Sequence, residues 1–342
     1  MNNFIEQLEK QRRKVDFDTY DFSVKELVSM SSDGIINVAP EYQRQFRWPV
    51  ENQSRFIESV LLGIPVPSLF MAANKDGTWE LIDGVQRLST LIHFIGDQEQ
   101  RSKFGFEKPL KIESLDGLTE LNGFCFNDMP LSVQLKLNLR PLKVTTLSDK
   151  SDMKVRFDLF ERLNTGGVTL TKQEIRGCVF RGEFNDFLND LSTNSEFNHC
   201  VNLPENKMKD GMRQELILKF FAYLNNRQNF DHSVVEFLNE YMSKSSVQFD
   251  YRKNRKIFET TFEQLKDALP FGIKRGSRQL TPINLFEAIS IGAADAIISG
   301  KNVAASNVAT WIDDKELTAL TSGATNSRKR LVDRIKYCFD RF

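Results

Sequence analysis

The sequence has no excess of either charge and contains few cysteines. Lysine plus arginine number 46 and aspartate plus glutamate also number 46, so the formal net charge is zero. The strong basic excess that is usual in a dedicated nucleic-acid-binding protein is therefore missing, although local basic patches stay open. The four cysteines have neither metal-ligand nor redox spacing, which favours packed thiols in a reducing compartment. They are Cys125, Cys178, Cys200 and Cys338.

Long apolar runs, internal repeats and low-complexity tracts are also missing. No segment approaches the roughly 20 apolar residues of a membrane-spanning helix. The segment Met1–Lys14 is polar and lacks the apolar core of a secretory signal. We therefore expect a cytoplasmic protein without a membrane partner. The three histidines form neither a metal-ligand pattern nor a His-Asn-His nuclease pattern, and no Walker loop or glycine-rich dinucleotide turn occurs.

What the sequence does contain predicts two domains. Up to residue 148 the pattern mixes strands and helices, with an Asp-Gly hairpin turn between the strands Ser68–Ala73 and Thr78–Ile82. From residue 149 onward the pattern is almost wholly helical. We predict an α+β fold in which an α/β domain (1–148) precedes a mainly α-helical domain (149–342). The 28 phenylalanines against 6 tyrosines predict a core rich in phenylalanine.

The segment Asp83–Arg87 is the first candidate site, because a predicted strand ends there and a helix begins. First-turn amides and the helix dipole favour an anion at such a place, and Gly84 lets a ligand approach the backbone closely. Arg87 can reach a phosphate, Asp83 can hold a divalent cation or a water, and Gln86 can orient a water. The alternative is structural, with Asp83 as a helix cap and the other side chains solvated.

The segment Pro40–Pro49 is the second candidate, because it places two arginines among three aromatic residues just before a helix. The planar guanidinium groups of Arg44 and Arg47 are suited to grip phosphate, and the rings can shield it or stack on a base. The alternative is an ordinary loop that is anchored by its packed aromatic side chains.

Three further features are candidates for site contacts or for structural roles. Asn164 and Thr165, followed by two glycines, either end a helix or deliver an amide and a hydroxyl into a site from the second domain. Met212–Glu215 opens a helix and suggests surface or interdomain contacts. The basic clusters 252–256 and 328–336 either touch nucleic-acid phosphates or form solvated helix faces.

Taken in order, these segments resemble the N-terminal family of GmrSD-type restriction enzymes, a branch of the ParB/sulfiredoxin-like superfamily with the hallmark Asp-Gly-Gln-Gln-Arg. The similarity runs from about residue 20 to about residue 230 and continues more weakly to the end of the chain. It implies a small ParB-like α/β core followed by a helical region. It also implies nucleotide binding and hydrolysis of a nucleoside triphosphate that controls a nuclease, in restriction of modified DNA or defence against phage.

The resemblance assigns roles to particular residues. Asp83, Gln86 and Arg87 are expected to be catalytic, with Asp83 holding Mg²⁺. The nucleotide is expected to contact Arg44, Gly84, Arg87 and Asn164, which match the family pattern, and we add their neighbours Gln43, Arg47 and Thr165.

Two departures from the family keep other functions open. The first glutamine of the hallmark is Val85 here, and a valine cannot hydrogen-bond to phosphate or water. Nothing after residue 230 resembles a His-Asn-His nuclease. We therefore expect a nucleotide-binding, NTP-hydrolysing component whose partners are a nucleoside triphosphate, a separate nuclease or effector protein, and DNA as a further candidate. The alternatives are a metal-dependent DNA nuclease and a non-hydrolysing module that binds DNA or a partner.

Overall fold

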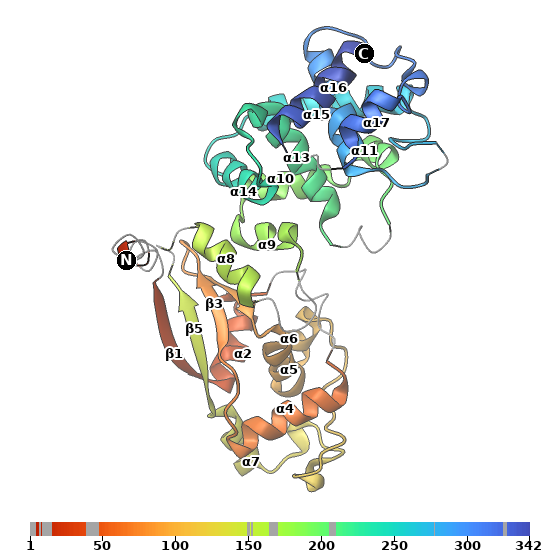
Figure 1. Cartoon of the computed structure of the whole chain (residues 1–342). Coiled ribbons are helices and arrows are strands. Elements are labelled where there is room, and N and C mark those ends of the chain that lie inside the picture. Colours follow the sequence, from red (N-terminus) through yellow and green to blue (C-terminus); the bar gives the residue numbers. More distant parts are fainter. Residues whose placement is uncertain are drawn as a thin grey trace. The chain divides into compact units, whose positions relative to one another are not determined.

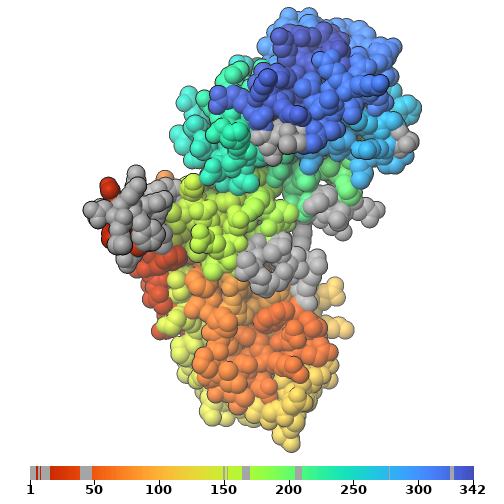
Figure 2. Space-filling model, in the orientation of Figure 1, coloured from red at the N-terminus to blue at the C-terminus, as the bar shows by residue number. Residues whose placement is uncertain are grey.

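The computed structural model of the chain divides into two compact units, Met1–Thr169 and Leu170–Phe342. In the space-filling view, red to yellow-green atoms make up the first unit and green to blue atoms the second, so each is built from one continuous stretch of chain (Figure 2). The residues that the structure describes are 5–6, 8, 16–38, 48–148, 151, 153–163, 170–204, 210–276, 278–323 and 327–342.

A five-stranded mixed sheet organises the first unit, in the order β1-β5-β3-β4-β2. The central strand β3 lies parallel to β5 and antiparallel to β4, with Leu69 opposite Val144 and Ala73 opposite Trp79. Helices cover this sheet, which confirms the predicted α/β character (Figure 1). The strands are β1 (Phe17–Ser23), β2 (Ile36–Asn37), β3 (Leu69–Ala73), β4 (Trp79–Asp83) and β5 (Pro141–Leu147).

The helices of the first unit begin and end where local signals predict. Ser23 caps the first of them by accepting a hydrogen bond from the Glu26 amide, and Gly63 ends the second in a left-handed conformation. The stretch 96–130 contains one short α-helix, which Asp97 caps. The helices are α2 (Val24–Ser32), α4 (Val50–Leu62), α5 (Val85–Ile95), α6 (Gln98–Lys103), α7 (Leu131–Asn138) and α8 (Met153–Leu163), with 3-10 turns η1 (Thr119–Leu121) and η2 (Phe126–Asp128).

The two units divide later than the composition shift at residue 148, because α8 belongs to the first unit. Phe157 and Phe160 of this helix are buried, and α8 packs against β4. The Arg156 guanidinium donates to the carbonyl of Ala73 and to Oδ1 of Asn74, both at 3.0 Å. The helix-rich part of the sequence therefore begins within the first unit, with α8.

The second unit is helical in its described part and has a core of aromatic rings, as the phenylalanine content predicts. Phe220, Phe258 and Phe262 are fully buried and contact one another edge-on or tilted, at centroid distances of 4.6 to 5.7 Å. The helices are α9 (Lys172–Val179), α10 (Glu183–Leu191), α11 (Ser195–Cys200), α13 (Met212–Asn226), α14 (Val234–Ser245), α15 (Tyr251–Ala268), α16 (Ile283–Ile298), α17 (Lys315–Thr321) and α18 (Arg328–Arg341), with 3-10 turns η3 (Arg227–Asn229) and η4 (Val308–Thr310).

The thiols behave as the spacing of the cysteines predicts. All four are free, and Cys178, Cys200 and Cys338 are buried in the second unit, while Cys125 of the first unit is half-buried. Burial raises the pKa of the Cys200 thiol to about 12. No described helix combines the length and apolar composition that crossing a membrane requires.

Candidate functional site

The junction between β4 and α5 has a backbone that only glycine fits. Gly84 lies between the last strand residue, Asp83, and the first helical residue, Val85, with φ of +106°. A Cβ atom at this position would stand 2.3 Å from the Leu69 Cδ2 atom of the neighbouring strand. The glycine therefore permits both the left-handed turn and the close packing of the junction on β3.

The first turn of α5 is electropositive. Gly84 supplies no side-chain cap, and the first turn contains no acidic residue. Backbone amides at such a helix start point outward and carry the positive end of the helix dipole. Asp83 does not cap this helix, because Gly84 is its N-cap residue. The junction thus has the character of an anion site.

Arg87 lies at this junction and is held by three oxygen atoms. Its Nη2 atom is 2.5 Å from Oδ2 of Asp83, and its Nη1 atom donates to the carbonyls of Pro67 and, at 2.9 Å, Ser68. The Arg87 side chain is 12% exposed and that of Asp83 is 38% exposed. Three of the five guanidinium N–H groups are therefore used within the described residues, and the fork ties the loop before β3 to the start of α5.

Gln86 contacts the end of the arginine-containing segment. Its Oε1 atom accepts a hydrogen bond of 3.1 Å from the Trp48 amide. The Trp48 carbonyl accepts a second hydrogen bond, of 2.9 Å, from Nε2 of Gln53 on α4. The Trp48 ring meets Phe56 edge-on at 5.8 Å. The structure thus brings Gln86 together with a residue of the second candidate segment.

Gln53 and His93 are neighbours of the junction that the sequence did not single out as site residues. Gln53 is 3% exposed, and its Oε1 atom lies 2.8 Å from Nδ1 of His93. His93 stacks on Phe106 at 4.1 Å, and burial lowers its pKa below the usual value. A signal was present in the sequence, because Gln53 is a polar residue on the apolar face that carries Phe56 and Val60.

Five of the predicted site residues lie outside the described residues: Gln43, Arg44, Arg47, Asn164 and Thr165. The predicted residues whose geometry is defined are therefore the four of the β4–α5 junction. Within the described part of the chain, no group of three or more His, Cys, Asp or Glu side chains is placed to hold a metal ion. Asp83 supplies a carboxylate, the ligand type that Mg²⁺ prefers, and Mg²⁺ is commonly held by one or two carboxylates together with waters and phosphates.

In the second unit, Glu215 of the segment Met212–Glu215 takes part in a largely buried ion-pair chain. Glu215 lies 3.2 Å from Arg176 and 3.6 Å from Lys219. Lys219 lies 3.3 Å from Glu287, which pairs in turn with Arg334. These charges join α9, α13, α16 and α18. Arg334 of the predicted basic cluster is therefore neither a solvated side chain nor available to DNA.

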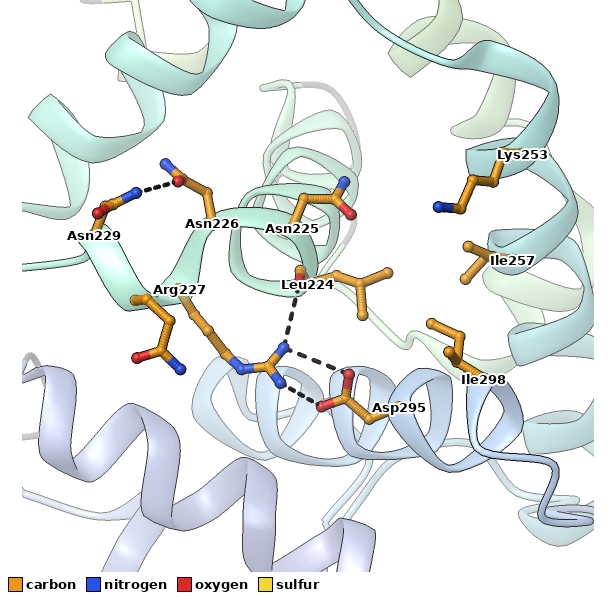
Figure 3. Close-up of a pocket in the computed structure, with 10 residues that line it drawn as sticks. Leu224, Asn225, Asn226, Arg227, Asn229, Lys253, Ile257, Asp295 and Ile298 are labelled. Carbon is orange, nitrogen blue, oxygen red and sulfur yellow. Dashed lines mark hydrogen bonds and ion pairs between the residues drawn. The ribbon is translucent and has the colours of Figure 1, made fainter.

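A surface pocket of about 360 Å³ lies in the second unit where α13 ends (Figure 3). Arg227 and Asp295 close one side of it through two hydrogen bonds, of 2.8 and 3.4 Å. Burial raises the pKa of the Asp295 carboxyl, although the neighbouring Arg227 lowers it. Lys253 of the first basic cluster lines the pocket, but none of the four predicted site residues that the structure describes does.

Comparison with known proteins assigns the part of the chain that contains the junction to a protein family. Residues 24–181 match the family described as the N-terminal domain of the GmrSD restriction endonuclease. No curated protein matches the chain, and no solved structure does. The matched stretch includes the four motif residues from Asp83 to Arg87, the whole described sheet except β1, and helix α9. Residues 24–181 therefore form a GmrSD restriction endonuclease N-terminal domain.

Proposed function

We propose that this chain is the nucleotide-handling component of a restriction or anti-phage defence system. It binds a nucleoside triphosphate at the β4–α5 junction and hydrolyses it with Mg²⁺. The observation that carries the proposal is the uncapped first turn of α5 behind Gly84, with the Asp83–Arg87 pair beside it. This arrangement supplies amides and a guanidinium for phosphate oxygens, and a carboxylate for a cation.

The chemistry assigned to these residues is positioning and charge neutralisation, which phosphoryl transfer mainly needs. The amides of the first turn bind phosphate oxygens, and Arg87 binds them with the donors that Pro67, Ser68 and Asp83 do not use. Asp83 holds Mg²⁺ together with water and the phosphates. Arg44 and Asn164 join the site on the strength of the family pattern alone.

A second candidate function is a nucleotide switch that binds without hydrolysis. Val85 has no polar side-chain atom, and the Oε1 atom of Gln86 already accepts a hydrogen bond from the Trp48 amide. The first hallmark position is therefore apolar, and the glutamine at the second shares its amide oxygen with the Trp48 backbone. This observation favours tight binding with slow turnover over rapid hydrolysis.

The test is nucleotide binding and phosphate release by the purified chain with Mg²⁺ and each of the four common nucleoside triphosphates. Asp83→Asn keeps the size of the side chain and removes its charge, so hydrolysis should fall by roughly 100-fold or more, as for lost electrostatic stabilisation. Asp116→Asn is the matched control, because that carboxylate is 97% exposed. It should leave both activities unchanged.

The outcomes separate the candidates. Turnover that Asp83→Asn abolishes supports the hydrolase, whereas binding without turnover supports the switch, and Val85→Gln should then raise phosphate release. If none of the four nucleotides binds, both the hydrolase and the switch are overturned. Magnesium-dependent nicking of plasmid DNA by the pure chain, lost in Asp83→Asn, would instead support a nuclease.

A further inference from the structure

Two glutamines from different helices hold the peptide groups of one residue. The Trp48 amide donates to Oε1 of Gln86 on α5, and the Trp48 carbonyl accepts from Nε2 of Gln53 on α4. Gln53 is 3% exposed, so its two polar groups depend on protein partners and not on water. The backbone of Trp48 is therefore fixed on both sides, directly before α4 begins.

His93 fixes the orientation of Gln53. Because Nε2 of Gln53 donates to the Trp48 carbonyl, its Oε1 atom faces Nδ1 of His93 and accepts a hydrogen bond of 2.8 Å from it. The imidazole is held in turn by its stack on Phe106, at an interplanar angle of 9°. A chain of hydrogen bonds thus runs from His93 through Gln53 and Trp48 to Gln86.

We propose that Gln53 and His93 are positioning residues of the nucleotide site, acting through the Trp48 peptide on Gln86. This inference rests on the proposed nucleotide binding. Neither residue belongs to the motif segments, and neither is expected to touch the ligand. Their effect should resemble that of outer-shell residues, whose loss typically weakens function 10- to 100-fold.

The first measurement is the affinity of the full chain for whichever common nucleoside triphosphate the wild type binds most tightly with Mg²⁺. Gln53→Leu and His93→Leu should weaken it roughly 10- to 100-fold. His93→Gln should restore most of it, because its amide can again donate to Gln53. Asn122→Leu is the matched control, since the Asn122 amide holds the Leu115 backbone at 2.9 and 3.1 Å in the same unit. That variant should lose stability but keep its affinity.

The second measurement needs no nucleotide. In a chain with Trp79→Phe and Trp311→Phe, Trp48 is the remaining tryptophan, and its emission reports its surroundings. Gln53→Leu and His93→Leu should shift that emission, whereas His93→Gln and Asn122→Leu should not. Urea unfolding of each variant verifies that it is folded, and His93→Leu replaces Gln53→Leu if the latter is not.

The two measurements distinguish failure of the proposed nucleotide binding from failure of the proposed positioning role. If the wild type binds no nucleotide but the emission shifts as expected, the hydrogen-bond chain stands and its proposed link to a nucleotide fails. If the wild type binds and neither Gln53→Leu nor His93→Leu changes affinity or emission, the positioning role is overturned. Equal weakening by Asn122→Leu would also overturn it, because general loss of stability would then explain the effect.

Discussion

At the scale of single residues, Gly84 is a position where the backbone has little choice. Two separate constraints meet there, a positive φ and the presence of the Leu69 side chain within 2.3 Å of the place that a Cβ atom would take. Gly77, in the hairpin before β4, shares the first constraint, with φ of +85°, but has nothing within 4 Å of the corresponding place. The pair therefore separates backbone strain from a steric clash.

We predict that Gly84→Ala destabilises the chain more than Gly77→Ala does. The left-handed conformation costs a non-glycine residue about 1–2 kcal/mol, and overpacking adds about 1–3 kcal/mol at Gly84 only. Urea denaturation of both variants measures the difference, and nucleotide titration follows the site. Equal destabilisation would mean that β3 yields to the added methyl group and that close packing at the junction is not required.

Arg87 shows how the same residue can serve the fold and the ligand. Sequence reasoning gives it the role of a phosphate ligand, and the structure gives it three protein oxygens in addition. Substituting Arg87 therefore loosens the loop at Pro67 and Ser68 as well as the anion site. For this reason a loss of binding in Arg87→Ala cannot be assigned to phosphate contact alone, and Asp83→Asn is the cleaner variant.

At the scale of elements, buried charges join the helices of the second unit. Glu287 on α16 is 3% exposed and lies between Lys219 on α13 and Arg334 on α18. Removing one partner of such a buried pair leaves a desolvated charge without its counterion. The exposed pair of Arg255 and Asp190 joins α15 to α10 at 2.6 Å, but its side chains are 40% and 59% exposed.

We predict that Glu287→Gln lowers the free energy of unfolding by about 3–5 kcal/mol, the usual cost of breaking a buried pair. Asp190→Asn should lower it by about 1 kcal/mol or less, because water screens the exposed pair. Chemical denaturation followed by circular dichroism compares the two variants. A small effect of Glu287→Gln would show that the neutral amide satisfies both cations.

Most elements could be predicted from the sequence, because their signals are local. Helices α4, α5 and α7 have the bounds that apolar periodicity and their terminal residues indicate. Strand β1 was not predicted, since it is an exposed edge strand in which acidic residues interrupt the apolar alternation. The link between Gln53 and Trp48 could not be predicted either, because it depends on how α4 and α5 pack. Of the candidate site, the motif was predictable and its supporting contacts were not.

At the scale of the molecule, the two units each have their own core, and α8 decides where the first one ends. The buried rings of Phe157 and Phe160 and the hydrogen bonds of Arg156 to Ala73 and Asn74 tie this helix to the sheet-containing unit. A boundary drawn from composition at residue 148 removes all of these contacts.

We predict that the fragment 1–169 unfolds cooperatively and that the fragment 1–148 does not. Burying a phenylalanine side chain contributes about 1.5–3 kcal/mol, so losing two approaches the marginal stability of a small domain. Thermal unfolding followed by circular dichroism is the measurement, and the fragment 170–342 serves as the companion with a complete aromatic core. Equal cooperativity of the two N-terminal fragments would remove α8 from the first unit.

The accessibility of the thiols reports which of the two units has unfolded. Cys125 is the half-buried thiol of the first unit, and the three thiols of the second unit are buried. A maleimide dye should therefore mark the folded chain at Cys125, and brief pulses of dye during unfolding would add label at three further positions when the helical unit opens. Mass spectrometry of the labelled peptides would then give the time course of unfolding for each unit separately, and no engineered cysteine is needed.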